Sequence, residues 1–421
     1  MKDLDTAASP DDQARAILTA NDRGGYTVPT DGLYPYQWNW DSAFAALGFA
    51  TFDIDRAWAE VETLFTGQWD NGMVPHILFH KPDPGYFPGP DVWGCPGPIP
   101  SSGISQPPVA ATFIRHIYDA DPKAGRARLE ALVPKLAAWH RWFMDWRSYE
   151  GAICITHPWE AGRDNAPDWD AAMAAITPDG VGEYQRRDLG HVDAAMRPTK
   201  EDYDRYIWLV QRGRRLGWDE PKLAEDRPFM VADPTMTFVL MRANRDLLAL
   251  ADVIGHPTAE IEAWSTTLAQ GADTLWNPDI AAYDSRDVRS GARTGTVSNA
   301  SFLCWYAGLA APEALPAFDR VAAAAPFGVP SYDPGAADFD ARRYWRGPSW
   351  PMLNMAIAWG LSEQGHTARA ETLRASTATL LTRHGFYEYF DPTDGHPAGG
   401  SNFTWTAAIW LVWASPNAGD R

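Results

Sequence analysis

The stretch TFVLMRANRDLLALADVIG, residues 237–255, decides the fold class of this chain. Its apolar residues recur at spacings of three and four, the period of an amphipathic helix, and it ends on Gly255, a common helix terminator. Strand-like fragments are short, for example 151–157 and 385–390, and no strand–helix–strand series with a glycine-rich first turn supports a doubly wound nucleotide-binding fold. The sequence therefore predicts an all-α protein, with further helical patterns at 53–66, 107–120, 122–146, 198–217, 258–275, 299–310, 313–325, 349–364, 366–383 and 403–414.

A weak internal echo indicates how these helices are arranged. TVSNASFLCWYAGLA follows a segment containing Tyr283, and GGSNFTWTAAIWLVWA follows FYEYFDP, so that Ser298-Asn299 aligns with Ser401-Asn402. The separation corresponds to two helical hairpins with their loops. Repeated units of that size are typical of a toroid in which paired helices ring a central cavity.

Composition limits the partners of this chain. Its 421 residues include 36 basic and 54 acidic ones, and the formal charge of −18 repels nucleic acid and anionic membrane surfaces. The N-terminus has no apolar stretch of signal-peptide length, and no later run approaches the roughly 20 apolar residues of a membrane span. We therefore expect one cytoplasmic domain over residues 1–421 with no nucleic-acid or membrane partner, and leave homo-oligomerisation open.

Aromatic content is the outlying feature, with 21 Trp and 15 Tyr. Such side chains combine a flat apolar face with a polar tip, which suits stacking against a ligand with many hydroxyls. Many lie in loops rich in Pro and Gly, at 33–44, 80–108, 157–173, 342–352 and 384–405. In a toroid these loops converge at one end and could wall a pocket, with 80–105 and 155–200 as its cap. The alternative is that each ring packs against its own helix pair.

Several standard catalytic and cofactor motifs are missing. The sequence contains no GxSxG, HExxH, GxxxxGK[ST] or GxGxxG, so it gives no support to a serine hydrolase, a zincin or a common nucleotide-binding site. His76 and His80 have the spacing of a helical pair but no obvious third ligand. The cysteines, Cys95, Cys154 and Cys304, are far apart and fit buried thiols. We expect neither a metal nor another cofactor.

Carboxylates within aromatic loops are the chemistry that remains. HPWEAGRDNAPDWDAAM, residues 157–173, carries Glu160, Asp164, Asp168 and Asp170, and its prolines predict a loop that runs into a short helix. The segment could be a solvated polar loop. It could also supply one of the two carboxyl groups that glycosidic bond cleavage needs, a protonated one for the leaving oxygen and an ionised one to activate water or attack carbon.

Four motifs in matching order favour the second interpretation. They are YPYQWNWDSAF (34–44), HPWEAGRDN (157–165), YWRGPSW (344–350) and FYEYFDPTDGHPAGGSNFTWTAA (386–408). Together they resemble bacterial members of glycoside hydrolase family 63, especially the mannosylglycerate and glucosylglycerate hydrolases. The resemblance covers most of the chain and implies an (α/α)6 barrel that hydrolyses α-glycosides with inversion.

The resemblance also implies roles for single residues. Asp164 matches the general acid of the family, and Glu388 in FYEYFDP matches its general base. Glu160 would shape the loop or bind sugar hydroxyls, whereas Asp168 and Asp170 are interpreted as helix-start carboxylates. Ala161 and Arg163 depart from the family, in which we expect Ser and Met at these positions.

Substrate-binding residues follow from the same resemblance. For Asp41, the alternative is a helix cap before SAFAALGFA. The implied sugar contacts are Tyr34, Trp38, Trp40, Asp41, Trp159, Tyr344, Trp345 and Trp350, and the implied leaving-group contacts are Tyr86, Gln106, Arg197 and Tyr203.

Arg197 suggests that the leaving group is an acid. It precedes Pro198, a residue favoured at the first helical position, so its guanidinium would lie near a helix N-terminus, where anions bind. Tyr203 could add a hydrogen bond from the same helix. The alternative is that Arg197 pairs with Asp193 or Glu201 on the surface.

The predicted substrate is accordingly glucosylglycerate or mannosylglycerate, since glucose and mannose differ only in the orientation of one hydroxyl. An α-glucosidase acting on a neutral, kojibiose-like disaccharide is the first alternative. A sugar epimerase or isomerase on the same barrel and a sugar-binding protein without turnover are alternatives from other classes.

Overall fold

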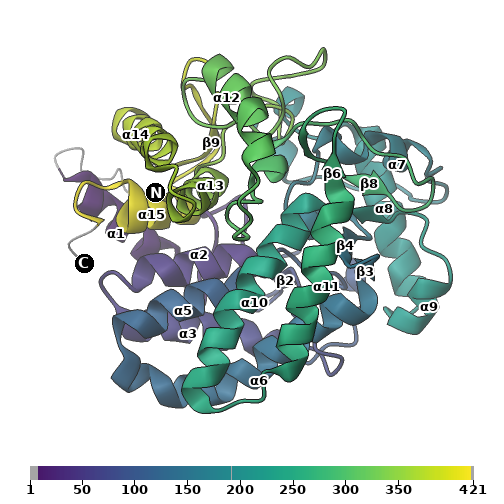
Figure 1. Cartoon of the computed structure of the whole chain (residues 1–421). Coiled ribbons are helices and arrows are strands. Elements are labelled where there is room, and N and C mark those ends of the chain that lie inside the picture. The colour runs from purple at the N-terminus through teal and green to yellow at the C-terminus, as the bar shows by residue number, and fades with distance from the viewer. Residues whose placement is uncertain (1–7, 191, 419–421) are drawn as a thin grey trace.

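The computed structural model describes residues 8–190 and 192–418. Within these ranges six segments form a closed inner ring, and Figure 1 shows α2, α5 and α10 as successive neighbours in it. Each segment packs against the next around the ring, and Gly360 brings α13 against the backbone of Trp305 and Tyr306, which follow η6. The last segment, α15, packs against the first, α2, and so closes the ring. In chain order the inner segments are α2 (Asn39–Phe49), α5 (Ala110–Ala120), α10 (Pro234–Ile254), the short 3-10 segment η6 (Asn299–Phe302), α13 (Pro351–Glu363) and α15 (Thr404–Ile409).

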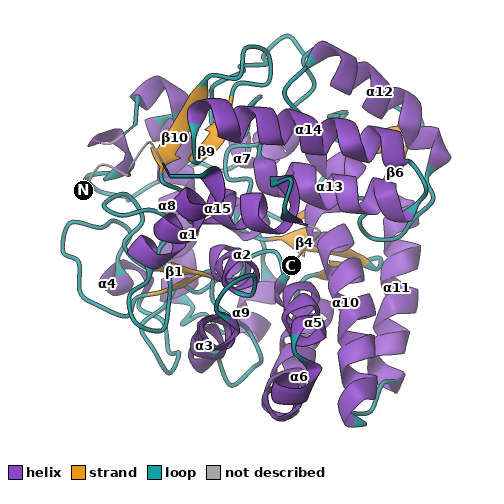
Figure 2. Cartoon of the chain, turned by 90° about the vertical axis from the view of Figure 1, so that its left-hand side faces the viewer, coloured by secondary structure: helices purple, strands orange, loops and turns teal. Residues whose placement is uncertain are grey.

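An outer layer of helices covers the ring, one beside each inner segment. Figure 2 shows α10 beside α11 and α13 beside α14, and the Phe318 ring of α12 packs 5.4 Å from that of Phe302 in η6. This arrangement confirms the predicted (α/α)6 toroid. The outer helices are α1 (Pro10–Asn21), α3 (Ile54–Leu64), α6 (Pro122–Trp146), α11 (Ala259–Leu275), α12 (Leu315–Ala324) and α14 (Thr367–His384).

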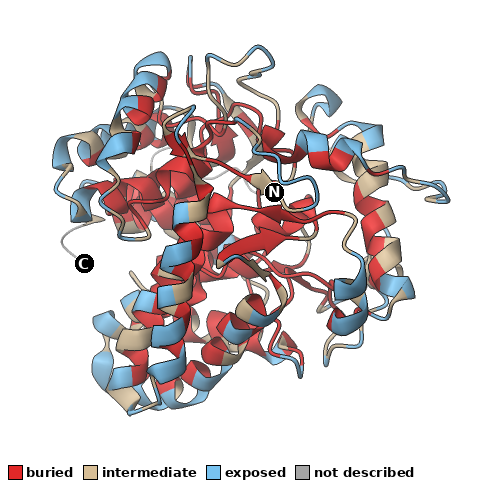
Figure 3. Cartoon of the chain, turned by 45° about the vertical axis from the view of Figure 1, so that its right-hand side comes forward, coloured by how far each residue is buried: buried red, intermediate tan, exposed pale blue. Residues whose placement is uncertain are grey.

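Burial follows the two layers. All residues of α2 are buried, whereas α3 buries one stripe that includes Trp58 and Val61. Figure 3 shows the same contrast between a buried interior and outer helices whose outward side is exposed. A helix that is apolar all round needs protein on every side, which the ring provides. No helix in the described ranges is both long and apolar enough to cross a membrane.

The internal echo marks equivalent positions in the ring. Ser298-Asn299 opens η6 and Ser401-Asn402 immediately precedes α15, and the helices α12, α13 and α14 lie between them. The two segments are thus two hairpins apart, as predicted. The expectation of a continuous helix over 299–310 is wrong, because only Asn299–Phe302 is helical, with 3-10 geometry, and turns follow to Gly308.

Short strands lie among the loops that connect the helices. The predicted fragments 151–157 and 385–390 contain β4 and β9. The pairs are antiparallel: β1 (Gln37–Trp38) with β2 (Ile77–Leu78), β6 (Trp276–Asn277) with β7 (Ala282–Tyr283), β9 (Tyr387–Phe390) with β10 (Pro397–Ser401), and a sheet in the order β3 (Ser148–Tyr149), β4 (Ala152–Ile155), β5 (Val231–Ala232) and β8 (Arg286–Asp287).

Further short helices belong to the connections. The longest is α8 (Lys200–Arg215), which the helical pattern at 198–217 predicts. The others are α4 (Pro90–Trp93), α7 (Asp170–Ala174), α9 (Glu220–Glu225), the π-helical η8 (Trp410–Ala414) and the 3-10 segments η1 (Phe65–Gly67), η2 (Pro158–Ala161), η3 (Pro167–Trp169), η4 (Asp188–Gly190), η5 (Ala194–Met196) and η7 (Pro312–Ala314).

The two ends of the described chain meet where the ring closes. The Asp11 carboxylate of α1 accepts hydrogen bonds from Trp410 Nε1 at 2.7 Å and from the Ser415 hydroxyl at 2.8 Å. Asn21, the last residue of α1, donates to the Thr404 hydroxyl at 2.9 Å. Polar bonds buried at both ends of α1 therefore fix it to α15 and η8.

Candidate active site

A pocket at the loop end of the ring brings together nearly all the residues predicted to bind or act on a substrate. It lies between loops that are far apart in the sequence, including those around residues 34–41, 76–88, 159–164, 187–203 and 388–405. The predicted residues that line it are Tyr34, Trp38, Trp40, Asp41, Tyr86, Gln106, Trp159, Asp164, Arg197, Tyr203, Tyr344 and Glu388.

The loop that carries Asp164 is shaped by a required glycine. The 3-10 segment Pro158–Ala161 ends at Gly162, whose φ of +66° lies in the left-handed region. A side chain at Gly162 would place its Cβ 2.7 Å from the ring of Trp40, which is too close. Glycine therefore allows the backbone before Asp164 to lie directly on the indole that forms the pocket wall.

Asp164 is held through its backbone while its side chain faces the pocket. Its carbonyl accepts a hydrogen bond from the Tyr206 hydroxyl at 2.9 Å and another from Trp169 Nε1 at 3.2 Å. Burial raises the pKa of the Asp164 carboxyl to about 7, which the charge of Arg197 opposes and that of Glu388 assists. A carboxyl group with this pKa can carry and release a proton near neutral pH.

The buried carboxylate of Glu160 holds the loop that carries Asp164 in place. It is 1% exposed, accepts a hydrogen bond from the Thr156 backbone at 2.6 Å and pairs with Arg147 at 2.9 Å. Since both carboxylate oxygens are engaged within the protein, the structure favours the loop-shaping alternative for Glu160 over sugar binding.

Arg163 forms a buried ionic cluster directly beside Asp164. Its guanidinium is fully buried and pairs with Asp168 at 3.1 Å and with Asp233 at 2.9 Å. Asp233 caps α10, and Ser298, which precedes η6, also accepts a hydrogen bond from Arg163. Asp168 and Asp170 lie in the first turns of η3 and α7, as predicted for helix-start carboxylates, but the side chain of Asp168 caps no backbone N–H in the described chain and instead binds Arg163 across the loop.

Replacing Arg163 by methionine should destabilise the protein by about 3–5 kcal/mol, because the carboxylates of Asp168 and Asp233 would stay buried without their partner. Arg346 offers the matched control. Arg346 is also buried, but its partners Asp170 and Asp338 have side chains that are each 54% exposed, so water can solvate these carboxylates once Arg346 is replaced and the loss should be smaller. Urea unfolding of both variants measures the difference, and equal losses would contradict this account.

Glu388 enters the pocket from β9 and is bound by two donors. The Tyr34 hydroxyl donates to Oε1 at 3.0 Å, and the backbone N–H of Gly400 in β10 donates to Oε2 at 3.0 Å. A side chain at Gly399 would place its Cβ 2.4 Å from Oε2, so glycine is required there too. Burial raises the pKa of Glu388 above its usual value, although Arg197 and these hydrogen bonds lower it.

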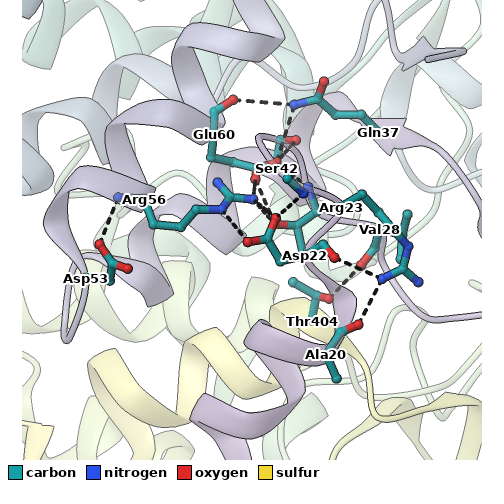
Figure 4. Close-up of polar contacts among 12 residues, drawn as sticks. Ala20, Asp22, Arg23, Val28, Gln37, Ser42, Asp53, Arg56, Glu60 and Thr404 are labelled. Atoms are coloured by element: carbon teal, nitrogen blue, oxygen red, sulfur yellow. Dashed lines mark hydrogen bonds and ion pairs between the residues drawn. The ribbon is translucent and has the colours of Figure 1, made fainter. Parts of the chain in front are cut away.

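The loop that carries Tyr34 is fixed from behind by a buried carboxylate (Figure 4). Glu60 of α3 accepts hydrogen bonds from the hydroxyls of Thr27 at 2.7 Å and Ser42 at 2.5 Å. Arg56, one turn earlier on α3, adds an ion pair at 2.7 Å. These bonds join the loop before Tyr34 to α2 and to α3 of the outer layer.

Arg197 lies inside the pocket with its guanidinium held on three sides. Its Nε donates to Asp188 at 2.9 Å, its Nη2 donates to the Tyr34 hydroxyl at 3.2 Å, and its Cζ lies 4.0 Å from the centre of the Tyr344 ring. The side chain is 7% exposed, and its Nη1 has no hydrogen-bond partner among the described residues. The pocket lining thus includes a buried guanidinium whose charge can attract an anion.

The surroundings of Arg197 differ from the sequence expectation in two ways. The surface alternative is wrong, since Asp193 caps η5 and Glu201 pairs with Arg205. The helix N-terminus is also not an anion site, because α8 begins at Lys200 and is closed by a capping box of Thr199 and Asp202. The anion-binding potential therefore resides in the guanidinium alone.

Asp41 is not a helix cap. The N-cap of α2 is Trp38, and Asp41 lies in the first turn, where it lines the pocket with 4% of its surface exposed. Burial raises the pKa of its carboxyl well above the usual value, and the charge of Glu388 adds to this rise. Gln106 faces the same turn and accepts a hydrogen bond from the Trp40 backbone at 3.3 Å.

Trp345 and Trp350 do not line the pocket, which corrects the expectation that both contact the sugar. They are fully buried and stack on each other with centroids 3.7 Å apart. Trp345 lies behind Trp40 at 6.4 Å, and Trp350 lies behind Tyr344 at 5.3 Å. The stacked pair supports the rings that form the wall.

Sequence reasoning missed several pocket residues. Asp188, which pairs with Arg197, belongs to a loop without periodicity or a motif. Phe403 and Trp405 stand inside the quoted motif SNFTW and could have been included on that signal. The structure adds His76, Phe87, Arg187, Asp188, Phe403 and Trp405 to the lining. Within residues 8–190 and 192–418, no cluster of three or more His, Cys, Asp or Glu side chains is arranged to hold a metal ion.

Comparisons with known proteins show the family of the chain. Residues 34–406 match the model of the mannosylglycerate hydrolase MGH1-like glycoside hydrolase domain. The chain is 44% identical to mannosylglycerate hydrolase MGH1 of Selaginella moellendorffii (95% of this chain, 84% of the relative) and 33% identical to a glucosylglycerate hydrolase of Mycolicibacterium hassiacum (95% and 96%). The crystal structure of a GH63 mannosylglycerate hydrolase from Thermus thermophilus, in complex with Tris and D-glycerate, superimposes with a TM-score of 0.92 at 42% identity (96% and 99%). The chain therefore belongs to the mannosylglycerate hydrolase MGH1-like glycoside hydrolases, within glycoside hydrolase family 63.

Proposed function

We propose that this enzyme hydrolyses a small α-glycoside whose leaving group carries a carboxylate, glucosylglycerate or mannosylglycerate, with inversion at the anomeric carbon. The observation that carries the proposal is the buried Arg197, which lines the same pocket as Asp164 and Glu388 and whose Nη1 has no hydrogen bond among the described residues. A guanidinium binds a carboxylate through charge-assisted hydrogen bonds. The names of the relatives and the D-glycerate bound to the solved one support the same class of substrate.

In this mechanism Asp164 is the general acid and Glu388 is the general base. Asp164 carries a proton and donates it to the glycosidic oxygen as the bond to the sugar breaks. Glu388 is ionised and removes a proton from the water that attacks the anomeric carbon from the opposite face. An inverting pair stands about 6.5–9.5 Å apart so that this water fits between base and sugar.

The remaining lining residues divide into two subsites. Trp38, Trp40 and Trp159 would present rings to the sugar, and Asp41 would accept hydrogen bonds from its hydroxyls. Tyr86, Gln106, Arg197 and Tyr203 would hold the leaving group. Loops 80–105 and 155–200 would act as the cap over a single catalytic domain.

The pH dependence of kcat/KM should be bell-shaped, with its alkaline limb near pH 7. Asp164 must be protonated to act as an acid, and burial raises its pKa to about 7, so activity falls as the pH rises through that value. Glu388 must be ionised, and burial raises its pKa too, so activity also falls as the pH drops through that pKa. Initial rates across the acidic to mildly alkaline range measure both limbs. An alkaline limb far above pH 7 would argue against Asp164 as the acid.

Replacing Arg197 by alanine should remove the preference for an acidic leaving group. The wild-type enzyme should favour the glycerate glycoside over the glycerol glycoside by roughly 10–100-fold in kcat/KM, because a charged hydrogen bond contributes about 1.5–3 kcal/mol. Without the guanidinium most of this preference should be lost. The measurement is kcat/KM for both substrates with both enzymes.

Arg187 provides the matched control for this experiment. It also lines the pocket, but its Nη2 is already bound to Asp83 at 2.6 Å. Arg187→Ala should therefore keep most of the preference for the acid. Equal efficiency of the wild-type enzyme on both substrates would refute the carboxylate site and favour a neutral α-linked glucobiose.

A further inference from the structure

Arg197 is linked to the proposed base, Glu388, by a short chain of hydrogen bonds. Its Nη2 donates to the Tyr34 hydroxyl at 3.2 Å, and this hydroxyl donates to Glu388 Oε1 at 3.0 Å. Its Nη1, on the same planar group, has no partner in the described parts of the chain. An anion on Nη1 would therefore be linked to the Glu388 carboxylate through the guanidinium and the Tyr34 hydroxyl.

The charge of Arg197 also acts on both carboxyl groups of the proposed mechanism. It lowers the pKa of Asp164 and the pKa of Glu388, against the effect of burial on each. The site is surrounded by protein, so charges interact there more strongly than in water. Any ligand that offsets this charge changes the proton affinity of both groups at once.

We propose that the carboxylate of the substrate takes part in the chemical step: by binding Nη1 of Arg197 it offsets the cation that the free enzyme directs at Asp164 and Glu388. This inference rests on the proposed acidic substrate. In the complex Asp164 keeps its proton to a higher pH, and Glu388 accepts a proton from water more readily. Binding of the substrate thus favours the protonation states that the acid Asp164 and the base Glu388 need for the reaction.

The hydrogen-bond chain acts in the same direction as the charge. When an anion attracts the guanidinium at Nη1, the bond from Nη2 to the Tyr34 hydroxyl weakens. The hydroxyl is then a weaker donor to Glu388, whose carboxylate becomes more basic. Asp188 keeps Nε of Arg197 engaged at 2.9 Å, which fixes the guanidinium beside the Tyr34 hydroxyl.

Other charged and titratable groups of the protein also face Asp164 and Glu388. Their identity does not change when one enzyme is tested on substrates with different leaving groups. Comparing leaving groups within one enzyme therefore isolates the effect of the added carboxylate. The groups that act on Asp164 or Glu388, or are acted on by them, are Asp41 from α2, Tyr34 before β1, Asp188 and Arg197 from the cap loop, Tyr206 from α8, Tyr344 before α13 and Tyr389 from β9.

The test compares pH profiles for an α-glycosylglycerate, its methyl ester and the glycerol glycoside. The profile of kcat/KM reports the free enzyme, whereas that of kcat reports the enzyme–substrate complex. The alkaline limb of kcat/KM should be the same for all three substrates, which is the internal control. The alkaline limb of kcat should lie about one pH unit higher for the acid than for the two neutral substrates.

Three outcomes are decisive. If the acid is preferred but the kcat limbs coincide, the coupling is wrong and the proposed function stands. If the acid is neither preferred nor distinct in its kcat limb, both are wrong. If only the acid shows an alkaline limb of kcat at higher pH, while the methyl ester follows the glycerol glycoside, the coupling is supported. A difference in leaving-group acidity is then excluded as the cause of the shift.

Two variants locate the coupling in Arg197. Arg197→Met should raise the alkaline limb of kcat/KM, since the free enzyme then lacks the cation, and should abolish the difference between acid and ester. Arg186→Met is the control, because Arg186 also pairs with Asp188, at 2.7 Å, but does not line the pocket. The difference should persist in that variant. A difference that survives in Arg197→Met would overturn the proposal.

Discussion

Asp164→Ala should lower kcat for the glycoside substrate by about 10²–10⁴-fold, the contribution of a positioned general acid. The leaving oxygen would then depart without a proton, which raises the barrier to bond cleavage. The fold should be unaffected, because the protein holds Asp164 through its backbone carbonyl, which alanine retains. Product release under saturating substrate and thermal unfolding of the same sample measure the two effects.

The role of Asp164 can be distinguished from a structural one by changing the leaving group. Fluoride departs with little help from an acid, so the corresponding α-glycosyl fluoride should be hydrolysed with a much smaller loss. Asp170→Ala is the matched control, since this carboxylate lies in the same segment but pairs with Arg346 away from the pocket. Equal losses on glycoside and fluoride would mean that Asp164 is not the acid.

Glu388→Ala should cause a loss of similar size on both the glycoside and the fluoride, because attacking water must be activated whatever the leaving group. Glu388→Gln should behave in the same way while keeping the shape of the side chain and one acceptor for the Tyr34 hydroxyl. This contrast separates base from acid within one pair of substrates.

The configuration of the first sugar released tests the same assignment independently. With Glu388 as a base, an α-glycoside should first give the β-sugar, which NMR detects before the anomers equilibrate. A first product of α-configuration would mean that the carboxylate attacks carbon directly, as in retaining enzymes, whose carboxyl groups stand about 5–5.5 Å apart.

The sequence predicted amphipathic helices better than fully buried ones, whichever layer they belong to. The outer α3 and the inner α5 each bury one side, so their apolar residues are periodic. In contrast, α2 is buried on all sides and shows no polar face to define a period. In the segment 299–310 the sequence instead predicted more helix than the structure contains. Its apolar spacing also fits 3-10 turns packed inside the ring.

The candidate site was predictable where residues belong to a motif and unpredictable where loops meet. Asp164 and Glu388 lie far apart in the chain, and it was the resemblance to known motifs that linked them. The bond between Asp188 and Arg197 depends on the path of the irregular segment between α7 and α8, which leaves no periodic signal. Trp345 shows a further limit, because an aromatic motif does not tell a pocket wall from the layer behind it.

The contact of α1 with α15 and η8 has a consequence for biosynthesis. The helix α1 leaves the ribosome before the helices of the ring, but its buried partners Thr404, Trp410 and Ser415 are translated only after α14. Until then the growing chain is an open arc in which α2 and α13 lack the neighbour that separates their apolar sides from water. We therefore expect the nascent polypeptide to depend on chaperones that shield this arc, because exposed apolar surface favours aggregation.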